Sequence, residues 1–432
     1  ECLKNSDNIY ICFIFDPKQI DPNKNKYFSN NCVQFMIESL RELYQSSQKK
    51  LLFFHGDNIK VIKNTVKKLN IDSVYVNNDY TPFSIKRDKD IKNILDCDFY
   101  GFDDIVLNPM SEPKKADGKP YQVYSSYLKA IFDKPPKKPL QTSVKKKLKQ
   151  FDGKLEYQIG IDDLKKFYEY NKDINVNGGR KKAKNILNNI LDQKNYNELR
   201  SLCDYKSTHL SAYIKFGCVS IREVYWIFKN NLGGENGLVK QLYWREFYYY
   251  LLFYFPETLT KKIGLKKTYE NFPWEKDQNK FDKWCQGETG FPIVDASMKN
   301  LNKTGYLPNR SRLIVANFLT KILRVDWTWG EKYFAQQLVD YSPSNNLGNW
   351  QWVASIGSDY QNRIYNPMTQ SSKADPDCVY IKKWLPVLKD VKNKDIHNWP
   401  MNHEKYDINY NKPIVDYHDE YKKSKELFKQ YL

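Results

Sequence analysis

Short apolar runs alternate with helical patterns at the start of this chain, and this alternation limits the possible folds. Residues 9–17 and 51–57 are apolar runs closed by turn residues, as buried parallel strands are. Helical spacing follows over 31–48 and 58–69, and a third strand-like run lies at 73–76. The alternation predicts an α/β domain built on a doubly wound parallel sheet. No GxGxxG motif follows any of these strands, so a Rossmann dinucleotide site is unsupported.

The pattern changes after residue 111. Prolines interleaved with lysines, ending in a basic run at 145–147, predict an exposed connection, although such a run could also contact phosphate. Helical spacing dominates from about residue 160 onward. We therefore expect an α/β domain over 1–111, an extended interdomain linker over 112–159 and a mainly α-helical domain over 160–432.

The net charge of +18, from 69 Lys and Arg against 51 Asp and Glu, favours polyanionic partners. Nucleic acid is the first partner to expect, although lysine richness can also reflect an AT-rich genome. The 8 cysteines form no CxxC pair and no histidines cluster near them, so we expect reduced thiols, an intracellular protein and no metal site. No run is long enough for a membrane span. The start at Glu1, without an initiator Met, suggests part of a longer product.

An aromatic helix is expected over residues 241–250. Trp244 and Tyr248 share one face at i and i+4, with Gln241 a turn earlier. By periodicity alone, such a stripe is usually part of a core. Arg245 among these aromatic residues requires an anionic partner if it is buried.

Two further clusters could bind phosphate. Hydroxyl side chains gather at 207–211 ahead of a helix, where they could hold a phosphate or simply cap the helix. Arg310 and Arg312 are two residues apart and point in different directions, so one could face a phosphate while the other pairs inside. Both could equally be ordinary surface arginines.

Long motifs between about residues 196 and 395 resemble the FAD-binding half of the photolyase/cryptochrome family. They are Ser207-Thr208-His209-Leu210-Ser211, Tyr243-Trp244-Arg245-Glu246-Phe247-Tyr248, the segment from Gly287 to Ala296, Asn309-Arg310-Ser311-Arg312, Asp326-Trp327 and Gly348-Asn349-Trp350-Gln351-Trp352. Phe15-Asp16-Pro17 and the segment from Asn78 to Phe83 resemble the antenna domain of the same family. The resemblance is closest to class I DNA photolyases and covers nearly the whole chain. The family begins with a strand that would lie before Glu1, so the first strand is expected to be missing from the middle of the sheet.

The resemblance implies a FAD bound in the helical domain. Its diphosphate would meet the 207–211 segment, the Arg312–Asp340 ion pair would lie beside the isoalloxazine ring, and Asn346 would face its N5 atom. The full set of implied cofactor contacts is Tyr196, Ser207, Thr208, His209, Leu210, Ser211, Arg245, Arg312, Asp340, Ser342 and Asn346.

The resemblance also implies a path for electrons. Trp350, Trp327 and Trp274 match the family's three-tryptophan photoreduction chain, with Trp350 nearest the flavin and Trp274 at the surface. Indole is easily oxidised, and a relay of short hops is faster than one long hop. The alternative is that the three indoles only pack in the core.

Light-driven repair of cyclobutane pyrimidine dimers is the activity that this layout implies, with damaged DNA as partner and the protein as a monomer. The dimer must leave the duplex, so the site needs aromatic walls, which Trp244 and Trp352 match. Polar and phosphate contacts are implied for Gln241, Asn309, Arg310 and Arg363. An antenna chromophore, folate or deazaflavin, is a further expectation.

Three departures from the family pattern leave alternatives open. Gln241 stands where many dimer-specific photolyases have glutamate, and Ser342 replaces a second aspartate near the flavin. Pro308-Asn309 replaces the histidine pair that (6-4) repair needs. The alternatives are a cryptochrome-type blue-light receptor, a (6-4) photolyase-like protein and a degenerate or split-gene member. The +18 charge and the lack of a long tail after the helical pattern favour repair.

Overall fold

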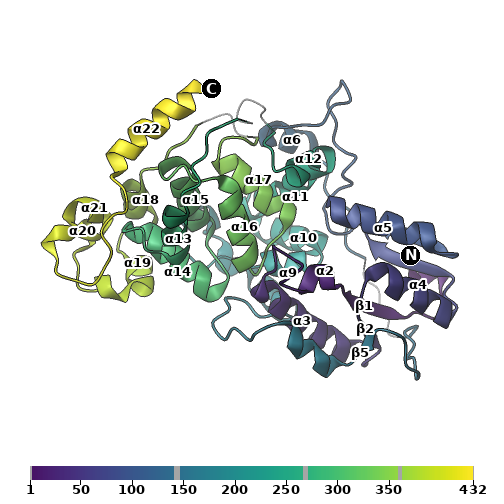
Figure 1. The fold of residues 1–432 in the computed structure, drawn as a ribbon. Helices are drawn as coiled ribbons and strands as arrows, with labels where there is room; N and C mark the ends of the chain where they lie inside the picture. The colour runs from purple at the N-terminus through teal and green to yellow at the C-terminus, as the bar shows by residue number, and fades with distance from the viewer. Residues whose placement is uncertain (1, 141–145, 266–270, 359–361, 432) are drawn as a thin grey trace.

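The structure is a computed structural model in which residues 2–140, 146–265, 271–358 and 362–431 are described. The start of the basic run at 145–147 lies outside them. A smaller α/β part lies beside a larger helical part (Figure 1), as the sequence predicts. None of the described helices is both long and apolar enough to cross a membrane.

The α/β part contains two parallel strand pairs. β1 (Ile11–Phe15) pairs with β2 (Leu51–His55), and β3 (Ser73–Asn77) pairs with β4 (Asp98–Phe102). Before β1 lies α1 (Cys2–Asn5), and the helices between the strands are α2 (Pro17–Ile20), α3 (Asn30–Ser46), α4 (Asn58–Leu69) and α5 (Pro82–Ile94). These bounds confirm the predicted strand and helix alternation, and β4 is an element that the sequence analysis did not identify. The two pairs lie in separate sheets of order β1-β2-β5 and β3-β4, and β5 (Gln158–Ile159) adds an antiparallel strand.

Asp16 accepts two hydrogen bonds that stabilise the turn after β1. Its carboxylate accepts a hydrogen bond from the backbone of Lys18 at 2.8 Å and so caps α2, which Pro17 begins. The same carboxylate accepts a second bond from the Asn58 side chain at 2.7 Å. One buried aspartate therefore joins the end of β1 to the start of α4.

The segment 112–159 is more structured than an exposed connection. It contains α6 (Tyr124–Ile131) and β5, and Tyr127, Leu148 and Leu155 are buried. Leu148 also forms a bridge with Ile9. The boundaries of this linker remain a prediction, but its side chains pack against both parts of the molecule.

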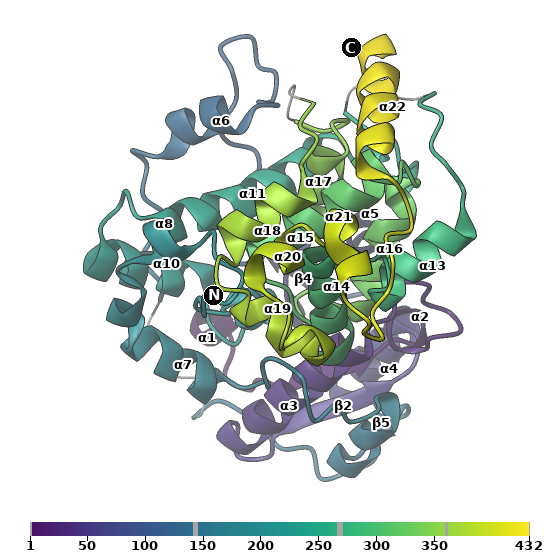
Figure 2. The same ribbon diagram turned by 90° about the vertical axis from the view of Figure 1, so that its left-hand side faces the viewer.

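The helical part has two large apolar core clusters, and α14 (Pro292–Thr304) contributes to one of them. Its helices are α7 (Arg180–Asn188), α8 (Tyr196–Leu199), α9 (Ser211–Lys215), α10 (Ile221–Leu232), α11 (Gly237–Tyr254), α12 (Glu257–Thr260), α13 (Gln278–Gln286), α14 (Pro292–Thr304), α15 (Asn309–Asn317), α16 (Trp327–Gln337), α17 (Pro343–Val353), α18 (Pro367–Ala374), α19 (Val379–Trp384), α20 (Asn393–His397), α21 (Trp399–Asn402) and α22 (Tyr417–Gln430). The turn before α14 is held by Asp295, which is fully buried and accepts bonds from the backbone of Thr289 at 2.8 Å and Gly290 at 2.9 Å. Seen from the side in Figure 2, α14 lies behind α19 and α20, while α22 extends away from the body.

Hydrogen bonds from α3 and to α11 help to fix the α/β part against the helical part. At the start of α3, Ser29 and Asn31 donate to the backbone carbonyls of Leu338 at 3.1 Å and Gln337 at 2.7 Å. These bonds hold the segment that leads into Asp340. On α11, the buried carboxylate of Glu246 accepts bonds from the backbone of Leu107 and, at 3.2 Å, from that of Asn108.

Glu246 gives a stability prediction. Replacing it with alanine leaves the buried Leu107 amide and the partly buried Asn108 amide without their acceptor, at a cost of about 3 kcal/mol. Burial raises the pKa of Glu246 from its usual 4.5 to about 7, against the hydrogen bonds that lower it. The folded protein therefore keeps this proton to a higher pH than the unfolded chain does, and this contribution to stability falls as pH rises from 4.5 to about 7.

Thermal unfolding of the Glu246→Ala and Glu246→Gln variants, measured across this pH range, tests the prediction. The advantage of the wild type over Glu246→Gln should shrink as pH rises. Glu235→Ala, which removes an exposed carboxylate just ahead of the same helix, should change little. An alanine variant at position 246 as stable as the wild type would show that these bonds contribute nothing net.

Candidate functional site

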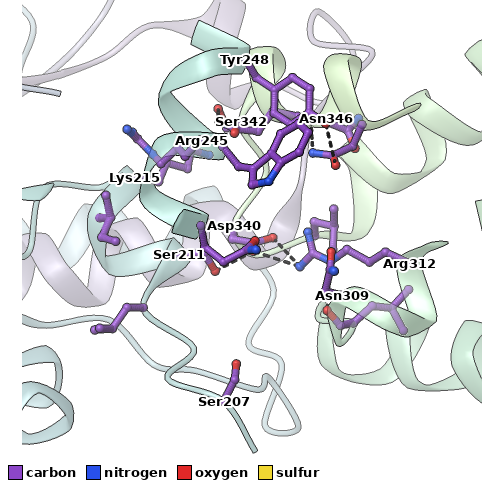
Figure 3. Close-up of a pocket in the computed structure, with 18 of the residues that line it drawn as sticks. Ser207, Ser211, Lys215, Arg245, Tyr248, Asn309, Arg312, Asp340, Ser342 and Asn346 are labelled. Carbon is purple, nitrogen blue, oxygen red and sulfur yellow. Dashed lines mark hydrogen bonds and ion pairs between the residues drawn. The ribbon is translucent and has the colours of Figure 1, made fainter. Parts of the chain in front are cut away.

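A cavity of about 430 Å³ opens in the helical part. Side chains from α8, α9, α11, α15 and α17 line it, together with the 207–211 segment and residues 340–342. Figure 3 shows several of them, among them Ser211, Arg245 and Asn346. Apolar walls with a few polar groups, in a volume of a few hundred Å³, are typical of small-molecule sites. All eleven predicted cofactor contacts lie in this lining, as do Gln241, Trp244, Asn309, Trp350 and Trp352.

An ion pair lies at one side of the cavity. The Arg312 guanidinium donates to both oxygens of Asp340, at 3.1 and 3.0 Å, and Ser211 donates to the same carboxylate at 2.7 Å (Figure 3). Burial alone would raise the pKa of Asp340, but Arg312 and Ser211 outweigh it and hold the pKa below its usual value. Asp340 therefore stays ionised and fixes the direction of the Arg312 side chain.

The 207–211 segment brings hydroxyl groups to the cavity. His209 in this segment has a left-handed backbone with φ of 51°, which turns the chain into α9. Asn175 lies 3.2 Å from its Nδ1 atom, and the His209 ring packs edge-on against Tyr306 at 4.6 Å. Burial lowers the pKa of His209, so its imidazole is neutral near pH 7.

Asn346 is held by a buried carboxylate. Its amide nitrogen donates to the backbone carbonyl of Glu331 at 2.8 Å and to the Glu331 side chain at 3.1 Å. Glu331 is fully buried and pairs with Lys262 at 2.8 Å. Because the amide nitrogen is already bonded, the amide oxygen of Asn346 is the atom left for a ligand.

The aromatic helix α11 presents one face to the cavity. Gln241, Trp244 and Tyr248 line it together, and the Gln241 amide has no hydrogen-bond partner among the described residues. Arg245 also lines the cavity; it is only partly buried, and none of the residues that the structure describes forms an ion pair with it. Its guanidinium donates to the Ile105 carbonyl at 2.7 Å and lies 4.6 Å from the Tyr249 ring. The Ile105 carbonyl and the Tyr249 ring thus interact with the guanidinium but do not neutralise it. Its positive charge stays available to a ligand in the cavity.

The three relay tryptophans differ in exposure and in whether they line the cavity. Trp350 is buried and lines the cavity, Trp327 is buried but does not line it, and Trp274 is partly exposed. The segments carrying Trp274 and Trp327 lie side by side, because Glu275 and Val325 form a parallel bridge. A Cβ atom on Gly330 would come within 2.2 Å of the Trp350 ring, so only glycine fits beside it.

Some predicted substrate residues lie away from the cavity. Arg310 does not line it, and its guanidinium lies 3.4 Å from the side chains of both Gln370 and Ser201. Arg363 stacks over the Trp352 ring, 5.5 Å from its centre. Ser342, by contrast, was predicted as a cofactor contact and does line the cavity, where its hydroxyl lies 3.2 Å from the Tyr249 hydroxyl.

Several lining residues were not identified from the sequence. Tyr306 and Arg200 were missed entirely, as was Lys215, although Tyr306 lies just ahead of the recognised Asn309 motif. Tyr248 was interpreted only as part of an aromatic stripe. Its i+4 spacing from Trp244, both following Gln241, was the available signal.

The polar side chains that line the cavity suit a dinucleotide, whose central diphosphate is negatively charged. Arg200, Lys215 and Arg245 supply positive charge, and the 207–211 segment supplies hydroxyl donors for phosphate oxygens. The Asn346 amide oxygen can accept a bond from a ring N–H group. Among the described residues, no group of His, Cys, Asp and Glu side chains could hold a metal ion.

Comparisons with known proteins agree with this geometry. A family model described as the FAD binding domain of DNA photolyase matches residues 238–430, and one described as DNA photolyase matches residues 1–144. A deoxyribodipyrimidine photo-lyase of Alkalihalophilus pseudofirmus is 34% identical, over 99% of this chain and 93% of its own length. The chain belongs to the photolyase/cryptochrome family. The resemblance seen in the sequence is therefore confirmed, as is the FAD-binding domain.

Other relatives span both branches of the family. A cryptochrome DASH of Synechocystis is 28% identical over 96% of this chain and 91% of its own length. An archaeal photolyase from Sulfolobus tokodaii, whose structure contains two FAD molecules, superposes with a TM-score of 0.88. It is 34% identical, and the match covers 99% of this chain and 94% of that chain.

Proposed function

We propose that this protein is a light-dependent DNA photolyase that splits cyclobutane pyrimidine dimers. The observation that carries the proposal is that Gln241, Trp244 and Trp352 open on the same cavity as Asn346 and Asp340. A base-binding face and a cofactor-binding face thus share one space. The names of the photo-lyase relatives support the same activity.

The cofactor would be held by groups of known position. The 207–211 hydroxyls and Arg245 would contact the diphosphate, and the Arg312–Asp340 pair would orient the ring system. Asn346, fixed by Glu331, would accept from N5. When bound and reduced, FAD supplies the light-driven electron that opens the cyclobutane ring.

The chain's own task at the substrate is positioning. Trp244 and Trp352 would stack on the extruded bases, a contact worth about 1–3 kcal/mol per base. The Gln241 and Asn309 amides have no partners among the described side chains and can bond to base carbonyls. Arg363, stacked on Trp352, would hold that indole and face a phosphate.

We infer that Trp274, Trp327 and Trp350 pass electrons inward from the surface to the cavity wall. Trp350 lines the cavity and Trp274 is partly exposed, which supports this order at its two ends. The positive charge left behind would move outward to Trp274, where water can stabilise it.

A cryptochrome-type role is the second candidate. Gln241 favours it, since this amide offers no carboxylate to the dimer, and the cryptochrome DASH relative adds support. We place the (6-4) substrate lower because Asn309 and Pro308 replace the histidine pair. We also propose that the protein acts as a monomer and uses a folate or deazaflavin antenna.

Illumination of a defined substrate tests the proposal. The purified protein, with its flavin chemically reduced, is mixed with an oligonucleotide containing one cyclobutane dimer and exposed to blue light. Chromatography should show intact thymines accumulating in light and none in darkness. Dimers that survive illumination would contradict repair and leave the light-receptor role, and a parallel (6-4) oligonucleotide should stay unchanged.

A further inference from the structure

The ring of Tyr124 lies flat against the ring of Trp244. Their centres are 3.6 Å apart and their planes differ by 11°. Tyr124 begins α6, in the connection between the two parts of the molecule, whereas Trp244 belongs to α11. Figure 1 shows α6 beside α11.

Trp244 belongs to two sets of residues on α11, one that contacts Tyr124 and one that lines the cavity. On one face, Tyr124 contacts Lys240, Trp244 and Phe247, whose spacing is that of successive helical turns. On the other face, Gln241, Trp244 and Tyr248 line the cavity, while Tyr124 does not. The tyrosine therefore covers one face of the indole without itself lining the cavity.

Tyr124 is held in position by its own hydroxyl and by neighbouring residues in the chain. Its hydroxyl donates to the Lys240 carbonyl at 3.0 Å. Its neighbours bind the same helix, because the Tyr121 amide donates to the Tyr250 hydroxyl at 3.1 Å, and Tyr127 lies within 3.5 Å of the Glu246 carboxylate. A displacement of Tyr124 would disturb several of these bonds.

We propose that Tyr124 is a positioning residue that holds the Trp244 indole ready to stack on an extruded base. This inference rests on the proposed function, which places a damaged base against Trp244. An indole covered on one face offers only its other face to a ligand, and a ring already held pays less conformational entropy on binding. The connection between the two parts thus contributes directly to substrate recognition.

Binding of DNA in the dark tests the inference. Dissociation constants are measured by fluorescence anisotropy for a single-stranded oligonucleotide with one cyclobutane dimer and for its undamaged counterpart. Loss of an aromatic stacking partner should weaken dimer binding by Tyr124→Ala about three- to tenfold. Binding of undamaged DNA should not change, because phosphate contacts dominate it.

Two further variants separate positioning from a structural role. Tyr124→Phe keeps the stacked ring and should restore binding to within about twofold of the wild type. Tyr124→Leu keeps an apolar side chain for packing but removes the flat ring, so it should resemble the alanine variant. Melting temperature and flavin content of each variant show whether it is folded and loaded.

The outcomes distinguish this inference from the function beneath it. A wild type that prefers the dimer, together with an alanine variant of equal preference, contradicts the role of Tyr124 alone. Tighter binding by the alanine variant also overturns it, because Tyr124 would then occupy the position on Trp244 where the base stacks. A wild type with no preference for the dimer contradicts the proposed function and this inference with it.

Discussion

Replacing Asp340 with asparagine is expected to remove most of the FAD from the purified protein. The Asp340 side chain is only 6% exposed and pairs with Arg312 at 3.0 Å. The substitution removes the charge that orients this guanidinium and leaves a partly buried cation without its anion. A hydrogen bond to a charged group contributes about 1.5–3 kcal/mol, so losing the contact that the oriented Arg312 makes with the cofactor should raise the dissociation constant for FAD roughly ten- to hundredfold.

Flavin content after gel filtration and titration of the apoprotein with FAD measure this effect. Asp390→Asn makes the same chemical change at an exposed ion pair and should retain the wild-type content. Circular dichroism separates a loss of cofactor from a loss of fold. If Asp340→Asn purifies with a full complement of flavin, the ion pair is not a cofactor contact.

Replacing Trp350 with phenylalanine should nearly abolish photoreduction of the bound flavin. Phenylalanine fills most of the space between Phe334 and Gly330, so flavin content should stay unchanged. It is much harder to oxidise than indole, so the inner end of the proposed relay would be blocked. Light-driven repair by chemically reduced protein should continue, because that reaction does not use the relay.

Trp284 provides the matched control. Its ring lies 6.2 Å from that of Trp350 and is fully buried, but it is not part of the proposed path. Absorbance spectra recorded during blue illumination should show a nearly normal photoreduction rate for Trp284→Phe. If this variant is blocked as strongly as Trp350→Phe, electrons travel through Trp284 and the assignment of Trp327 is wrong.

Much of the fold follows from local sequence. The strands at β1, β2 and β3 lie within or next to the predicted runs, because buried parallel strands need continuous apolar residues. β4 was missed since its residues are largely exposed and its sequence Asp98-Phe99-Tyr100-Gly101-Phe102 has no apolar run. The antiparallel β5 has only two residues, too few for any periodicity to indicate.

The candidate site was predictable where motifs are contiguous. The 207–211 segment and the helices bearing Arg312 and Asn346 could be identified because their neighbours in sequence are also neighbours in space. Contacts between distant segments could not be read this way. The stack of Tyr124 on Trp244 and the bond from Asn346 to Glu331 depend on how helices pack, which no local pattern encodes. Arg312 lines the cavity and Arg310 does not, because side chains two positions apart on a helix point in different directions.

The fluorescence of the reduced, protein-bound flavin tests most directly the claim that one cavity holds the cofactor beside a damaged base. Its lifetime is measured without DNA, with an undamaged single strand and with the same strand carrying one cyclobutane dimer. We predict that only the dimer shortens the lifetime, and that Trp244→Ala reduces this effect. An unchanged lifetime at saturating dimer would contradict the account, because the damaged base would then lie too far from the cavity to accept an electron.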